Sequence, residues 1–271
     1  MTRAEATSFA RPTDDGATIR HNSAAVGSMC PVLHDRADVS VMGEPLNPSG
    51  AAMRDRSESA IRTGLFARLA VVAAVAYQLL LIGLILLRPE IDPARKPISE
   101  YAIGRLGWLA VLAFQISGAA YACLVVALRH MLRDRLGRIG MVVLCYCAVA
   151  TVVVGLCVAD PVTTPMTELS VVGGVHVIAG TSAFLLLPVA ALMINISLSR
   201  TAGWAASRMQ LIVTGLLPSI GLVICAVLVA TVTPSEGWPP RLVFLTYAAW
   251  IVAVAISLWQ RSSADLHVMR T

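Results

Sequence analysis

The amino-acid sequence predicts an all-α, polytopic membrane protein folded as a bundle of six transmembrane helices. Hydrophobic residues make up 57% of the 271-residue chain and charged residues 14%, whereas about 25% of a soluble domain is charged. Each apolar block is close to the roughly 20 residues that cross a bilayer. Each block should be helical, because hydrocarbon offers no partners for free backbone groups. The blocks cover residues 65–87, 108–128, 139–158, 171–197, 211–231 and 242–259.

The chain divides by composition into a polar extension, a membrane domain and a short tail. Residues 1–60 have few aromatics and no periodic pattern, so we expect a disordered, cytoplasmic N-terminal extension. No apolar segment follows the N-terminus, so we expect no signal peptide. Met42 or Met53 is an alternative start. The six-helix domain is predicted at 61–262 and a cytoplasmic tail at 263–271.

The distribution of basic residues predicts the orientation of the chain. Twelve arginines flank the first block, the second and fourth loops and the end of the sixth block, against five cations in the other loops. The positive-inside rule then places both termini in the cytoplasm of a cell whose plasma membrane holds the protein. The twelve are Arg54, Arg56, Arg62, Arg68, Arg129, Arg133, Arg135, Arg138, Arg200, Arg208, Arg261 and Arg270, and the five are Arg88, Arg95, Lys96, Arg105 and Arg241.

Several function classes lack support in the sequence. The pI of about 9.1 reflects cations at the ends of apolar blocks, so we expect no nucleic-acid partner. Cys145 and Cys147 diverge around a helix, and no CxxC pair exists, so no metal site is expected. His176 is the one histidine in any span, which is too few for bis-histidine haem, and we expect no cofactor. Membrane lipids are the expected partners, and a homo-oligomer or another membrane protein stays open.

Polar residues near the predicted outer ends of the spans are the candidate site. Ser99, Glu100 and Tyr101 precede the second helix, Asp160 ends the third, and His176 lies about one turn inside the fourth. Threading alone brings these groups to one depth, although it does not place them side by side.

His176 and Gln115 are the polar candidates inside the spans. Helix neighbours of His176 include Gly173 and Gly180, and such small residues let helices approach closely. An ionisable residue inside the membrane indicates function, and a structural hydrogen bond is the equal alternative. Gln115 on the second helix has a similar small-residue setting.

The two carboxylates differ in their expected roles. Ser99 or Glu100 can cap the second helix, which would make either residue structural. A negative charge at a helix C-terminus is unfavourable, so Asp160 should either help to form a site or pair with a nearby cation. The candidate cations are Arg88, Arg95, Lys96 and Arg105.

Three further features carry weaker expectations. The basic loop around Arg133 is a topology signal first and a lipid-recognition element second. Gln78 should form an interhelical hydrogen bond. Pro188 and Pro218 should kink the fourth and fifth helices, which is ordinary in membrane helices but also shapes cavities.

Short motifs in matching order resemble the bacterial membrane family called domain of unknown function 998. The resemblance covers about residues 65–262 and implies six helices with no established activity. Cys157, Val158 and Ala159 stand where the family often has phenylalanine or proline before its Asp-Pro pair. The motifs are Pro97-Ile98-Ser99-Glu100-Tyr101-Ala102, Gly104, Gly107-Trp108, Gly137-Arg138-Ile139-Gly140, Asp160-Pro161 and Gly174-Val175-His176.

The leading functional hypothesis is a binding protein rather than an enzyme. A polar pocket in the outer leaflet would bind a lipid headgroup, a cation or a small polar solute. The first alternative is a lipid-modifying hydrolase in which His176 is the base, Asp160 orients it, and Ser99 or water is the nucleophile, or in which these groups hold a metal. A small-solute transporter is the further alternative.

Overall fold

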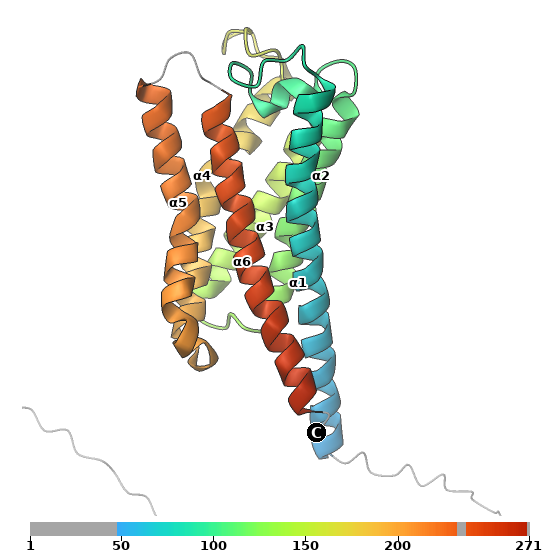
Figure 1. The fold of residues 1–271 in the computed structure, drawn as a ribbon, viewed down its shortest axis with the longest axis vertical. Coiled ribbons are helices and arrows are strands. Elements are labelled where there is room, and N and C mark those ends of the chain that lie inside the picture. Colours follow the sequence, from blue (N-terminus) through green and yellow to red (C-terminus); the bar gives the residue numbers. More distant parts are fainter. Residues whose placement is uncertain (1–47, 232–236, 270–271) are drawn as a thin grey trace, which may run out of the picture. The chain divides into compact units, whose positions relative to one another are not determined.

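The computed structural model describes residues 48–231 and 237–269, which lie in the second of two units, Leu46–Thr271 (Figure 1). Six helices are long and apolar enough to cross a membrane, and the described residues contain no strand. The all-α, six-helix prediction is therefore confirmed. The helices are α1 Pro48–Leu87, α2 Gly107–Leu128, α3 Arg135–Leu156, α4 Val171–Arg200, α5 Arg208–Thr231 and α6 Trp238–Val268, with short 3-10 helices η1 Ile98–Ala102 and η2 Ala202–Ser207.

The helices match the predicted blocks closely but are longer at the two ends of the domain. α3 ends at Leu156, two residues before the predicted limit, because Cys157 has extended backbone. α1 begins at Pro48, so residues 48–60 of the predicted extension are helical. Residues 1–47, with Met42, lie outside the described residues. α6 continues to Val268, so most of the predicted tail is helical.

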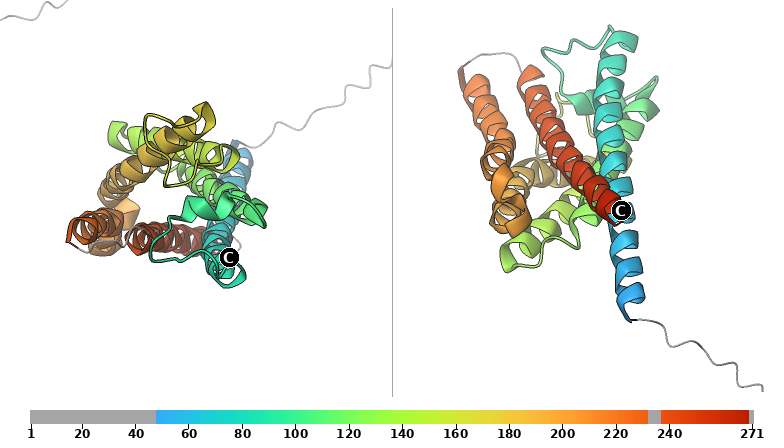
Figure 2. Two further views of the ribbon diagram at one scale, coloured as in Figure 1. Left: turned by 90° about the horizontal axis from the view of Figure 1, so that it is seen from above. Right: turned by 60° about the horizontal axis from the view of Figure 1, so that its bottom comes forward.

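The six helices form a ring in chain order. Each helix packs against its neighbours in the sequence, and α6 closes the ring by packing against α1. Figure 2 shows this order from above. Loops 88–106 and 157–170 lie at one end of the bundle, called the upper end, and loop 129–134 lies at the lower end with the start of α1 (Figure 1). α4 and α5 continue as helices through Pro188 and Pro218.

Buried polar side chains join the helices inside the apolar core. Asn195, which is 1% exposed, donates to the Leu211 carbonyl at 2.7 Å and accepts from the Trp250 indole at 3.0 Å. These bonds tie α4 to α5 and α6. Gln78 donates to the Phe244 carbonyl at 3.0 Å, which confirms the predicted interhelical bond. Satisfied amides of this kind stabilise helix contacts where water is absent.

Candidate ligand-binding site

A pocket of about 320 Å³ lies in the upper half of the ring. We call it the upper pocket. Three phenylalanines give it an aromatic wall, and Ser99, His176 and Thr181 add polar groups from η1 and α4. Its size falls within the range of ordinary small-molecule sites. The lining residues are Pro97, Ile98, Ser99, Phe114, Val154, His176, Val177, Gly180, Thr181, Phe184, Pro240 and Phe244.

His176 is buried and held in one orientation by the end of α3. Its Nδ1 lies 3.0 Å from the Val154 carbonyl oxygen and 2.6 Å from the Cys157 carbonyl oxygen. Carbonyls at the C-terminal end of a helix lack intrahelical donors, so the imidazole satisfies them. Since both partners are acceptors, Nδ1 carries a hydrogen, and in the neutral imidazole Nε2 is then the acceptor. Nε2 has no hydrogen-bond partner among the described residues.

The residues of η1 divide between the pocket and the loop. Ser99 lines the upper pocket. Tyr101, 2% exposed, instead donates its phenol to the Ile91 carbonyl at 3.3 Å, and burial raises its pKa. Tyr101 therefore anchors the loop that carries Ser99.

Glu100 bonds across to the other upper loop. Its Oε1 accepts from the Val162 backbone N–H at 2.6 Å and lies 3.6 Å from Lys96 Nζ. α2 begins at Gly107, so the expected capping of that helix by Ser99 or Glu100 is wrong. The carboxylate instead fastens loop 157–170 over the upper end.

Asp160 stabilises the start of α4. Its two carboxylate oxygens accept from the backbone N–H and the hydroxyl of Ser170, at 2.7 Å and 3.0 Å. Ser170 is itself the N-cap of α4, accepting from the Gly173 N–H at 2.9 Å. A negative charge is favourable beside a helix N-terminus. Among the described residues Asp160 forms no ion pair, so the expected pairing with Arg88, Arg95, Lys96 or Arg105 does not occur.

Two arginines, Arg88 and Arg241, hold the backbone of loop 88–106. Arg88 donates to the Ile103 carbonyl at 3.1 Å and to Glu90 at 2.5 Å, and this bond lowers the pKa of Glu90. One nitrogen of Arg241, Nη1, donates to three carbonyls, at distances from 2.7 to 3.0 Å. They belong to Pro93, Lys96 and Gly237.

The predicted site residues are therefore only partly brought together. Ser99 and His176 line one pocket. Glu100 and Asp160 bind backbone in the loops, and in the described part of the chain neither bonds to the other or to His176. The Gln115 amide donates to the Val152 carbonyl at 3.1 Å and joins α2 to α3. No three His, Cys, Asp or Glu side chains gather as a metal site among the described residues.

A smaller cavity of about 40 Å³ adjoins the upper pocket on the inside. Phe114, Val154, Gly180, Phe184 and Phe244 line both spaces. This inner cavity is large enough for water and has polar partners for it. Its hydroxyl groups belong to Tyr77, Ser117, Tyr121, Thr151 and Tyr247.

The pocket depends on residues that the sequence pattern did not single out. Phe114, Phe184 and Phe244 come from three different helices, and Thr181 is one hydroxyl in a long apolar block. In the sequence each resembles ordinary membrane-helix composition. The one available signal was Gly180, four residues after His176, since a glycine leaves space beside the imidazole.

Comparison with known proteins identifies a family but no characterised relative. A search of curated proteins and a search of solved structures each found no match. The family model described as "Protein of unknown function (DUF998)" matches residues 66–257, which include η1, His176 and every side chain of the upper pocket. The match covers most of the six-helix domain and confirms the resemblance carried by the short motifs. This multi-pass membrane protein belongs to the DUF998 family.

Proposed function

We propose that this protein binds a membrane lipid whose head region is uncharged and forms hydrogen bonds. The observation that carries the proposal is the lining of the upper pocket. Its wall is aromatic, its polar groups are the side chains of Ser99, His176 and Thr181, and none of its described lining residues carries a carboxylate, ammonium or guanidinium. A site of this composition suits an amphiphile with hydroxyl or ester groups.

Each polar group has a defined role toward such a ligand. His176 Nε2 accepts a hydrogen bond, because Nδ1 already donates to the end of α3. The Ser99 and Thr181 hydroxyls donate to ester or carbonyl oxygens. The phenylalanine wall covers the glycerol and the first carbons of the chains, and the inner cavity holds a water or a terminal hydroxyl.

The position of Thr181 supports entry of the ligand from the side of the bundle. Thr181 lines the pocket yet is exposed, and it lies ten residues into α4, which is about 15 Å along the helix. None of the described lining residues comes from α5, and the last turn of that helix is largely exposed. A lipid can thus reach the pocket between α4 and α6 from the bilayer, which is the outer leaflet in the predicted orientation.

The same geometry ranks the other ligands lower. A divalent cation site usually includes carboxylate ligands; the upper pocket has none among its described lining residues, and Glu100 and Asp160 already accept hydrogen bonds from the loop backbone. A small polar solute would leave the three phenyl rings against water or against its own polar groups, which is unfavourable.

A lipid hydrolase is the second candidate, and one observation favours it. A histidine whose Nδ1–H is fixed and whose Nε2 is free has the form of a general base, and Ser99 lines the same pocket. Asp160 bonds to Ser170 rather than to His176, so backbone carbonyls would take its orienting role. Release of fatty acid from diacylglycerol by purified protein, lost in His176→Ala, would support this candidate over simple binding.

The binding proposal is tested by filling the pocket from α4. Gly180 lines both spaces, and a Cβ built there meets only Val154 Cγ2, at 3.5 Å, so a side chain fits the fold and enters the cavity. We expect Gly180→Leu to reduce labelling by a photoreactive diacylglycerol in nanodiscs by roughly tenfold or more. Gly174→Leu is the matched control, because it lies on the same helix with nothing within 4 Å of its Cβ. Equal labelling of wild type and both variants would contradict the proposal.

A further inference from the structure

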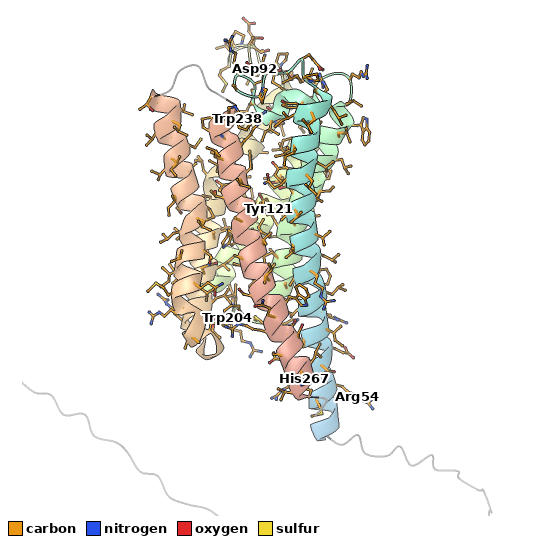
Figure 3. All side chains as sticks on the ribbon, viewed as in Figure 1. Arg54, Asp92, Tyr121, Trp204, Trp238 and His267 are labelled. Atoms are coloured by element: carbon orange, nitrogen blue, oxygen red, sulfur yellow. The ribbon has the colours of Figure 1, made fainter. Side chains whose placement is uncertain are left out.

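A second polar pocket, at the lower end of the bundle, has no part in the proposed lipid site. It has a volume of about 410 Å³ and lies between the first turns of α1, loop 129–134 and the last turns of α6. We call it the lower pocket. Figure 3 labels Arg54 and His267 at these ends of α1 and α6, beyond the level of Trp204. Its lining residues are Arg56, Ser59, Ala60, Thr63, His130, Met131, Arg133, Ser262, Asp265 and Met269.

The rim of the lower pocket carries more positive than negative charge. Arg56 and Arg133 are exposed on it, and neither forms an ion pair or a side-chain hydrogen bond among the described residues. His130 accepts from Arg129 Nε at 2.8 Å through Nε2, so its Nδ1 carries a hydrogen. Asp265 is the single carboxylate of the lining. Two free guanidinium groups at one pocket are the usual means of binding a phosphate.

The floor of the lower pocket contains an unpartnered hydroxyl. Thr63 is 4% exposed and lines the pocket, and its hydroxyl has no hydrogen-bond partner in the described part of the chain. A threonine inside a helix usually bonds to the carbonyl one turn earlier, and here that bond is absent. Ser262, beside it, donates to the Trp259 carbonyl at 2.8 Å, so its oxygen still accepts. The Thr63 side chain is almost fully buried, but its hydroxyl oxygen is accessible from the pocket and is therefore free to donate to a ligand oxygen.

We propose that the lower pocket binds a phosphate group, with Arg56 and Arg133 pairing with its charge and Thr63 donating to one of its oxygens. His130 Nδ1 supplies a further donor. The basic loop is then a binding element as well as a topology signal. The phosphate can belong to the headgroup of an anionic lipid, because Thr63 directly precedes the apolar part of α1. It can also be a soluble phosphate, because Arg56 lies two turns before Thr63, about 10 Å along the helix and away from the apolar part.

Asp265 makes the proposal sharply testable, because it opposes an anion and would favour a cation. Two assays on the full chain measure binding. In phosphatidylcholine nanodiscs, the protein is titrated with inorganic phosphate and the rise in Tm is recorded. On detergent-purified protein, native mass spectrometry records how much phosphatidylglycerol is retained. We expect one probe to bind saturably. Arg56→Gln and Arg133→Gln should each weaken it roughly tenfold, Thr63→Val several-fold, and Asp265→Asn should strengthen it.

The control is Arg54→Gln, which removes the same charge from α1 but does not line the pocket. Saturable binding of inorganic phosphate identifies a soluble ligand. Retention of phosphatidylglycerol with no rise in Tm on adding inorganic phosphate identifies a lipid headgroup. Either outcome supports the site. The proposal is overturned if neither probe binds wild type saturably, if Arg54→Gln weakens binding as much as Arg56→Gln, or if Asp265→Asn weakens binding.

Discussion

The charged side chains around the upper pocket and those around the lower pocket are used in opposite ways. At the upper end Glu100, Asp160, Arg88 and Arg241 all bond to loop backbone, and the pocket below them is neutral. At the lower end Arg56, Arg133 and Asp265 line a pocket without bonding to one another. A charge that already has hydrogen-bonded partners contributes to stability and has little left for a ligand. A free charge at a pocket remains available for binding.

This contrast predicts that charge-removing substitutions at Glu100, Asp160, Arg88 and Arg241 destabilise the fold, whereas those at Arg56, Arg133 and Asp265 change ligand affinity. Helix C-termini and extended loops leave carbonyls without partners, and the loops of the upper end are long. Loop 129–134 at the lower end is short, and Asp134 caps α3 by accepting from the Gly137 N–H at 3.3 Å. Fewer unpaired carbonyls there leave Arg133 without a backbone partner among the described residues.

The largest effect is expected from Arg241→Met. This change removes the side-chain donor of the Pro93, Lys96 and Gly237 carbonyls and leaves those of Pro93 and Lys96 unpaired under the loop, while the Gly237 carbonyl keeps the first backbone bond of α6. Removing the buried charge is itself favourable, since Nη2 of Arg241 has no partner among the described residues. The lost hydrogen bonds outweigh this gain, and we expect a net loss of about 3 kcal/mol in the free energy of unfolding. Thermal unfolding in detergent measures it. Arg105→Met, an exposed change in the same loop, is the control, and an equal loss there would contradict the prediction.

The fold was predictable because the length and hydrophobicity of each block report on the membrane directly. The depth of the candidate residues along the bundle was predictable for the same reason, and Ser99 and His176 line one pocket. Which of these residues lie side by side around the ring was not predictable, because Ser99 and His176 belong to elements whose neighbours depend on the packing of all six helices. The capping role of Glu100 was wrong because α2 begins seven residues later, at Gly107. Arg241 was counted only as a loop cation, since nothing in its sequence context reveals three carbonyls around one guanidinium nitrogen.

An intermediate effect is expected from Asp160→Ala. The variant loses two hydrogen bonds with Ser170 and a favourable charge at the start of α4. We expect a loss of about 1–2 kcal/mol in the free energy of unfolding and faster amide hydrogen exchange in the first turn of α4. Asp265→Ala at the lower end should change stability by less than about 0.5 kcal/mol, because its carboxylate is exposed and accepts no hydrogen bond among the described residues. Equal losses in the two variants would remove the contrast between the ends.

The smallest effect concerns Glu90, the exposed partner of buried Arg88. The hydrogen bond from Arg88 lowers the pKa of Glu90 in the folded protein, so the carboxylate stabilises the fold above its unfolded pKa of about 4.3. That contribution is lost as the pH falls through the lower, folded pKa. Wild type should therefore have a slightly higher Tm than Glu90→Gln at neutral pH, and the difference should vanish in acid.

The effect stays small because solvent screens an exposed pair. Arg88 also keeps its bonds to the Tyr101 and Ile103 carbonyls when Glu90 is neutral, so the loop itself should hold. A Tm difference that persists or grows on acidification would show that Glu90 acts through something other than its charge. In that case Arg88 would be the one residue of the pair whose charge stabilises loop 88–106, through its bonds to the backbone carbonyls.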